Sequence, residues 1–250
     1  MSTNRIEDSI CGVWRRLLPA TALLALLAGC ANKQSTTASA PPVRAPVPHV
    51  AHYATRFTQA EDPISEGGRW VGGKTVGLDW GNVSTTPGYA IGVAGPRSFA
   101  DSVALLSGDW PINQSVETTV DRRKVSHYPE VSLRLRSSLA KHNCDGYEIS
   151  FSLKDEDAAY LIIVRWNGPL ADFTYLVNAH GNQYAVKTGD VVKATIIGNE
   201  IKAYKNGALM GTARDNKYIH GAPGFGFNEG ENGDYGISSL SATATDAATF

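Results

Sequence analysis

Hydrophobic and polar side chains alternate along several short segments of this 250-residue chain. The clearest runs are 115–121, 130–136 and 146–153, where every second side chain is apolar. A two-residue period predicts β-strands with one face in a core and the other outside it. The segment 160–166 is apolar at almost every position before Arg165, which is typical of a central strand covered on both faces.

The same kind of pattern continues toward the C-terminus at 190–197, 201–205, 208–213 and 234–244. Asn206-Gly207 separates two of these runs, and this dipeptide favours a tight β-hairpin. No segment shows the 3.6-residue period of a helix over a helical length. The pattern therefore predicts an all-β domain over residues 54–250, folded as a two-sheet antiparallel jelly-roll sandwich.

The first 53 residues follow a different pattern. Arg15 and Arg16 precede an apolar run that ends at Gly29. As a helix, this run would span about 20 Å, which is short of the ~30 Å hydrocarbon core of a membrane. It therefore predicts a signal peptide over residues 1–29, the alternative being a buried apolar helix followed by an incidental cysteine.

The junction Leu27-Ala28-Gly29-Cys30 resembles the lipobox of bacterial lipoproteins. The resemblance implies cleavage before Cys30 and lipidation of its thiol, with a membrane as partner and the bacterial cell envelope as location. By the same resemblance, Ala31 in place of an Asp favours the outer membrane. The Pro-, Ser- and Thr-rich composition of residues 30–53 predicts a disordered tether behind the anchor.

Charge and cysteine content narrow the function classes. The chain has 23 Lys and Arg against 24 Asp and Glu, a net charge of −1, so no nucleic-acid partner is expected. With Cys11 removed in the signal peptide and Cys30 lipidated, Cys144 is left alone and an intramolecular disulfide is excluded. We expect a buried, inert thiol there, the alternative being a catalytic pair with His142.

Four stretches of the domain carry a family resemblance: Pro63-Ile-Ser-Glu-Gly-Gly-Arg-Trp70, Gly146-Tyr-Glu-Ile-Ser-Phe151, 189–207, and 221–227 followed by 234–242. Their order is similar to that of the concanavalin A-like lectin/glucanase superfamily, including its laminin-G-like modules. The resemblance implies the same sandwich. The superfamily contains lectins, sugar-binding modules, glycosidases, lyases and adhesion modules, so the fold does not choose among functions.

Glycosidases of this superfamily carry Glu-x-Asp-x-x-Glu on one strand, where alternate positions bring two carboxylates to one face. That motif is absent here, and the acid-rich stretches 155–157, 229–231 and Asp234 are predicted loops. An alginate-lyase site is only loosely resembled, and outside the expected pattern, by Arg134, His180, Gln183 and Tyr184. No catalytic residue is predicted, and enzymatic activity stays an open question.

The polar positions of the middle strands are the best candidate site. Glu117, Arg134, Arg136, Glu148 and Arg165 alternate with apolar residues on segments expected to be neighbours. They could form cross-strand ion pairs, worth about 0.2–1 kcal/mol each. They could instead line a groove in which Arg side chains grip an acidic or hydroxyl-rich saccharide.

Trp166 begins a predicted loop that also holds Phe173 and Tyr175, and exposed aromatic rings stack on sugars. The alternative for Trp166 is a place in the core. The saccharide-binding candidates are therefore Arg134, Arg136, Glu148, Arg165 and Trp166.

One oxygen-rich segment predicts a structural Ca²⁺ site formed by Asn228, Glu229, Glu231 and Asp234. Ca²⁺ takes six to eight oxygen ligands from flexible loops, and the superfamily resemblance implies such a metal. An ordinary solvated turn is the alternative.

Together these patterns predict a monomeric, membrane-anchored, non-catalytic carbohydrate-binding or adhesion module. A polysaccharide hydrolase or lyase is one alternative. A structural envelope protein that binds another protein is the other.

Overall fold

The computed structural model describes residues 48–93, 101–124, 128–228 and 233–248, and the structural statements below concern these residues. The predicted signal peptide, Cys30 and nearly all of the predicted tether lie outside them. No helix in the described part of the chain is both long and apolar enough to cross a membrane.

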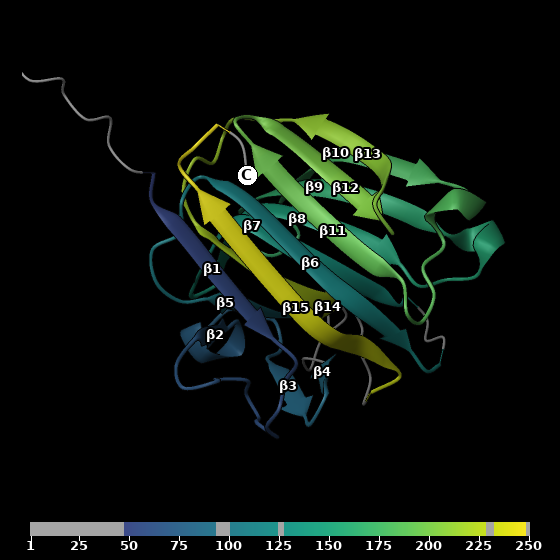
Figure 1. Ribbon diagram of the computed structural model, residues 1–250, viewed down its shortest axis with the longest axis horizontal. Coiled ribbons are helices and arrows are strands. Elements are labelled where there is room, and N and C mark those ends of the chain that lie inside the picture. Colours follow the sequence, from purple (N-terminus) through teal and green to yellow (C-terminus); the bar gives the residue numbers. More distant parts are fainter. Residues whose placement is uncertain (1–47, 94–100, 125–127, 229–232, 249–250) are drawn as a thin grey trace, which may run out of the picture. The chain divides into compact units, whose positions relative to one another are not determined.

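Two antiparallel sheets make up the domain (Figure 1). Sheet A runs in the order β13 (Ala208–Arg214), β12 (Glu200–Lys205), β11 (Val191–Ile197), β6 (Asn113–Arg122), β15 (Tyr235–Thr245), β4 (Tyr89–Gly92) and β3 (Val83–Thr86), with β1 (Val50–Thr55) also paired to β15. Sheet B runs in the order β10 (Phe173–His180), β9 (Tyr160–Gly168), β8 (Asn143–Ser152), β7 (Glu130–Ala140), β14 (Ala222–Asn228), β5 (Ser102–Leu106) and β2 (Trp70–Gly72). Three 3-10 turns, η1 (Lys74–Val76), η2 (Glu156–Ala158) and η3 (Asn182–Tyr184), lie in the connections.

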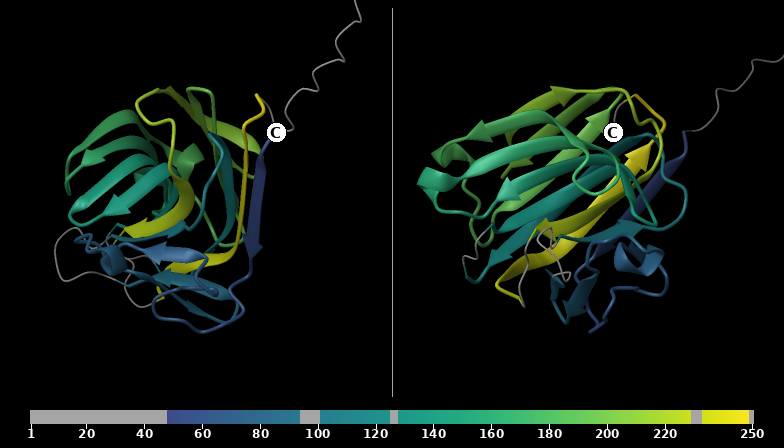
Figure 2. Two further views of the ribbon diagram at one scale, coloured as in Figure 1. Left: turned by 90° about the vertical axis from the view of Figure 1, so that its left-hand side faces the viewer. Right: turned by 180° about the vertical axis from the view of Figure 1, so that it is seen from behind.

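The predicted fold class is confirmed. Strands distant in sequence are neighbours, since β14 lies between β7 and β5, and β15 lies between β6 and β4. The side view in Figure 2 shows the two sheets facing each other. The predicted hairpin joins β12 and β13, and both turn residues have positive φ, 50° at Asn206 and 80° at Gly207, as such a tight turn requires.

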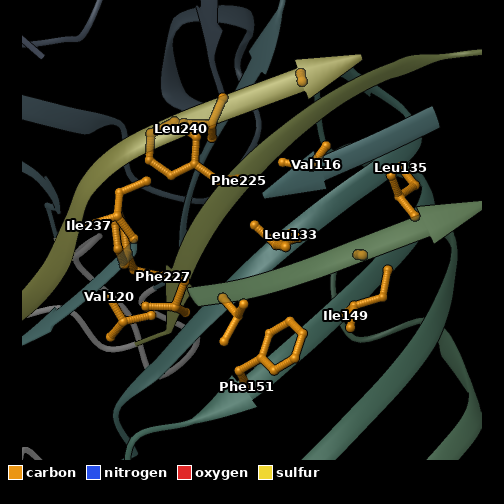
Figure 3. Close-up of a cluster of buried hydrophobic side chains, with 14 of the residues drawn as sticks. Val116, Val120, Leu133, Leu135, Ile149, Phe151, Phe225, Phe227, Ile237 and Leu240 are labelled. Carbon is orange, nitrogen blue, oxygen red and sulfur yellow. The ribbon is translucent and has the colours of Figure 1, made fainter. Parts of the chain in front are cut away.

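The core between the sheets is built by the predicted alternation. Val131, Leu133 and Leu135 of β7 point inward beside Ile149 and Phe151 of β8, and all are buried. Figure 3 shows Leu133, Leu135, Ile149 and Phe151 meeting Val116, Val120, Ile237 and Leu240 of sheet A, with Phe225 and Phe227 from β14. Each such side chain stabilises the fold by roughly 1.5–3 kcal/mol.

The first strand begins earlier than the predicted domain boundary at residue 54. β1 starts at Val50 and pairs with β15 from Val50↔Thr245 to Thr55↔Leu240 (Figure 1). This strand lies at the edge of the sheet and buries none of its side chains fully, so its sequence carries no clear hydrophobic alternation. Its partner is almost 200 residues away, which local composition cannot reveal.

The outer face of sheet B carries a second hydrophobic cluster that sequence alternation did not predict. Leu78 and Trp80, from the segment after η1, pack against Val103, Val164 and Trp166, with Leu105 and Cys144 also in the cluster. The middle strands of sheet B are consequently buried on both faces, as expected for 160–166. This cover encloses polar side chains that would otherwise face water.

Candidate functional site

A groove of about 190 Å³ lies on the outer face of sheet B. It is lined by Asp101, Glu130, Glu148, Ser150, Ile162, Val164, Trp166, Phe173, Tyr175 and Asn228. These residues come mainly from β7, β8, β9 and β10, which lie side by side in the view from behind (Figure 2, right). Larger hollows exist. One of about 620 Å³ over β1, β6 and β15 is lined by Arg56, Glu117 and several Thr and Ser side chains, with no aromatic ring.

Strand register brings the groove residues together. Arg134 of β7 lies opposite Glu148 of β8, and Glu148 lies opposite Val164 of β9. Trp166 in turn lies opposite Phe173 of β10. Because side chains at alternate positions share a face, this register places one continuous row of side chains across four strands.

An ion pair between Arg134 and Glu148 supports the floor of the groove. Arg134 Nη2 lies 3.0 Å from Glu148 Oε2, and the two side chains are only 1% and 8% exposed. Trp166 Nε1 donates to the same Oε2 at 2.5 Å. The Arg134 guanidinium lies 4.9 Å from the ring centre of Trp80 and 5.9 Å from that of Trp166, so it is enclosed by two indoles.

Glu130 is the second buried carboxyl group of the groove. The Tyr160 hydroxyl donates to it, and the side chains of Ser150 and Asn228 also hydrogen-bond to it. Burial raises the pKa of Glu130 to about 7, and the nearby charge of Glu148 acts in the same direction. Ser150 Oγ lies 3.2 Å from Glu148 Oε1, to which it donates, so this hydroxyl lies between the two carboxyl groups.

Aromatic rings form the wall of the groove on its β9–β10 side. The ring centres of Trp166 and Phe173 are 5.1 Å apart, as are those of Phe173 and Tyr175. Trp166 is 6% exposed, whereas Tyr175 is 53% exposed. The wall therefore runs from a fixed indole to an open phenol ring, which is an apolar surface next to carboxyl groups.

Three of the five predicted saccharide-binding residues meet at this groove: Glu148 and Trp166 line it, and Arg134 lies beneath them. The prediction that Arg136 shares this face is wrong. A bulge between Leu135 and Ser138 interrupts the alternation, and Arg136 has a positive φ of 45°. Its guanidinium donates to the carbonyls of Ile112, Tyr218 and Gly198, and it ties loops together.

The placement of Arg165 on this face is also wrong. Successive strand residues point to opposite faces, so Arg165 cannot share a face with Trp166. Arg165 pairs with Asp215, which also accepts the Tyr147 hydroxyl at 2.7 Å. Glu117 belongs to β6 of sheet A and lies outside the groove.

Sequence reasoning missed Glu130, Ser150 and Tyr160. The paired-carboxylate motif of glycosidases lies along one strand, whereas Glu130 and Glu148 lie on neighbouring strands and meet through Ser150. Glu130 has the parity of Arg134 on β7, so an outward position was predictable. Its contact with Ser150 depends on the β7–β8 register, which a single sequence does not give.

The predicted Ca²⁺ residues do not form a site in the described part of the chain. Asn228 hydrogen-bonds to Glu130, and Asp234 Oδ2 lies 3.6 Å from Lys124 Nζ. Glu229 and Glu231 lie outside the described residues. Among described side chains, no three His, Cys, Asp or Glu gather closely enough to hold a metal. Because two of the four predicted ligands lie outside the described residues, the Ca²⁺ site stays a prediction.

Cys144 is buried, as expected. It is 1% exposed, and burial raises the pKa of its thiol to about 12. The alternative of a catalytic pair gains no support, because His142 Nδ1 lies 2.9 Å from Asp79 Oδ2 in an exposed turn. The thiol remains protonated and unreactive at neutral pH.

No protein-family model matches this sequence, and no curated protein is similar to it. Several solved structures share its fold. The metal-free Emp46p carbohydrate recognition domain matches with a TM-score of 0.51 and 12% identity, over 76% of this chain and 95% of that chain. The Ca²⁺/Man-bound exoplasmic/lumenal domain of VIP36 gives 0.50 and 14%, over 76% and 91%. The CBM2 module of the evolved Dit of Lactobacillus casei BL23 phage J-1 gives 0.51 and 8%, over 81% and 99%.

At sequence identities this low, the structural similarity shows a common fold and does not show a common activity. The described chain has the two-sheet antiparallel jelly-roll fold of these structures.

Proposed function

We propose that this domain binds a saccharide in the groove on the outer face of sheet B. The observation that carries the proposal is the row of aromatic rings from Trp166 to Tyr175 beside the carboxyl groups of Glu130 and Glu148. A sugar ring presents an apolar face and a rim of hydroxyls. Aromatic side chains bind the apolar face, and carboxylate oxygens accept hydrogen bonds from the hydroxyls. The carbohydrate recognition domain of Emp46p, which shares this fold, supports the same role by analogy.

Each side chain has a distinct part in this proposal. Tyr175 is open to solvent and offers a stacking platform, while Trp166 is held in place by its bond to Glu148. Arg134 is a positioning residue, because it fixes Glu148 from below and is too buried to touch a ligand. Preformed geometry of this kind lowers the entropy lost on binding.

The test is a glycan-array screen with the full-length protein, followed by titration of the best ligand. Tyr175→Ala should weaken binding at least tenfold, since stacking on one ring is lost. Tyr204→Ala is the matched control, because Tyr204 lies on sheet A and lines a different hollow. Equal binding by both variants and the wild type would place the site elsewhere. No binding to any glycan would refute the proposed function.

A polysaccharide hydrolase is the second candidate. Burial raises the pKa of Glu130 to about 7, whereas Glu148 is held in an ion pair with Arg134. A carboxyl group with a raised pKa near a second carboxyl group is the arrangement that acid–base glycoside cleavage uses. Reducing-sugar release from a bound glycan, abolished by Glu130→Gln, would select the hydrolase; binding without release would select the module.

We also propose that the chain is anchored to the bacterial outer membrane through lipid on Cys30. The lipobox resemblance supports this, as does the length of chain between Cys30 and the start of β1 at Val50. Expression in a bacterium with labelled palmitate should give a labelled membrane-fraction protein. Cys30→Ala should lose both label and membrane association; an unlabelled wild type would contradict the anchor.

A further inference from the structure

We infer that the groove on sheet B accepts uncharged or amine-bearing saccharides and excludes anionic ones. This inference rests on the proposed saccharide-binding function. It reverses one expectation from the sequence, in which Arg side chains would grip an acidic sugar. The geometry points the other way because of where each charged group lies.

The ionisable side chains that line the groove are all acidic except for the phenol of Tyr175. Asp101, Glu130 and Glu148 come from three separate segments and converge on one cavity. No Lys, Arg or His is among the described residues that line it. A ligand entering the groove therefore meets carboxyl groups and aromatic rings.

Arg134, which lies beneath the groove, cannot serve an anionic ligand. Arg134 is 1% exposed and already paired with Glu148, and two indole rings enclose its guanidinium. Arg136 and Arg165 are directed to loop carbonyls and to Asp215. Lys154 Nζ lies over the rings of Tyr128 and Tyr160, at 4.1 Å and 5.8 Å from their centres, and does not line the cavity.

An anionic sugar would consequently be placed beside carboxyl groups, and no cation among the described lining residues would offset its charge. In a partly dry site this repulsion is weakly screened. A neutral sugar donates its hydroxyls to the same oxygens. An ammonium group makes charge-assisted hydrogen bonds to them and favours the ionised form of Glu130. The expected order of affinity is amine-bearing, then neutral, then anionic.

The experiment compares affinities of the full-length protein for glycans of equal length in the three charge classes. The probes are array glycans together with oligomers of glucosamine, N-acetylglucosamine, glucose and glucuronate. Every bound glycan should be neutral or amine-bearing, with anionic counterparts at least tenfold weaker. Anionic glycans that bind as tightly as neutral ones would overturn the inference while leaving the binding function intact. Absence of binding to all classes would overturn both.

Two variants separate local charge from overall charge. Glu130→Gln should reduce the ratio of the affinity for amine-bearing glycans to the affinity for neutral glycans several-fold. Glu117→Gln removes the same charge from sheet A, outside the groove, and should leave the preference unchanged. Thermal melting checks that both variants fold. An equal change in both variants would show that net charge, and not the groove, sets the preference.

Discussion

On sheet A, the outward-facing residues of β6 and β15, such as Glu117, Thr119 and Ser241, are exposed or half-buried. On sheet B, the corresponding residues of β7 and β8, such as Arg134 and Glu148, are buried. Both sets look alike in sequence, since each alternates with apolar residues. The difference arises because Leu78 and Trp80 cover part of sheet B.

Burial changes what a polar side chain contributes. On sheet A, two exposed polar groups that contact each other give up contacts with water. The net change in the free energy of folding is therefore close to zero. On sheet B, each buried group must find a partner, and losing that partner leaves an unsatisfied charge or dipole. A buried polar network is also rigid, which suits a binding site. The following substitutions test this contrast, from the largest expected effect to the smallest.

Replacing the buried cation should have the largest effect. Arg134→Met leaves Glu148 buried without its ion-pair partner, and we expect a loss of about 3–5 kcal/mol in the free energy of unfolding. Lys193→Met removes a cation from the outer face of sheet A and should change stability by less than about 0.5 kcal/mol. Urea denaturation measures both.

The double variant Arg134→Met/Glu148→Gln separates charge from packing. It should recover part of the stability lost by Arg134→Met, because no unpaired carboxylate remains. No recovery would mean that Arg134 stabilises the fold through contacts with Trp80 and Trp166 alone.

Glu130 should make stability depend on pH. Its folded pKa, about 7, is above the ordinary value of 4.5, so folding favours the protonated carboxyl. This contribution is fully present below pH 4.5 and is lost as the pH rises through 7. Relative to Glu130→Gln, the wild type should lose about 3 kcal/mol between pH 4.5 and pH 8. Urea denaturation at several pH values measures the difference, and parallel curves would contradict a buried, neutral Glu130.

Sequence alone was sufficient for the core and for the class of fold. Val131, Leu133 and Leu135 were placed inward by alternation, and Asn206-Gly207 marked its hairpin correctly. These features depend on local periodicity and turn geometry, and both can be recognised from residues that are adjacent in the sequence. Arg134 and Glu148 were found for the same reason. Trp166 was chosen as an aromatic residue of a predicted loop, whereas it lies in β9.

The remainder of the site depended on contacts that have no local signal. The bulge that turns Arg136 away lies inside a regular alternating run, and Glu130 meets Glu148 only through cross-strand register. Trp80 covers sheet B from a segment without strand periodicity. Arg165 is different, because strand geometry alone excludes it from the face of Trp166.

The smallest effect is expected on the outer face of sheet A. Ser239 Oγ donates to Thr119 Oγ1 at 3.1 Å across the β15–β6 pair, and both residues are half-buried. Ser239→Ala should cost about 0.5 kcal/mol, because water can replace the lost partner of Thr119. Ser150→Ala is the matched change on sheet B, where the hydroxyl is buried between two carboxyl groups. It should cost about 1–3 kcal/mol, since water cannot enter to replace it. If the two substitutions had equal effects, burial would not be what distinguishes the sheets, and the groove would be a solvated surface with no pre-organised site.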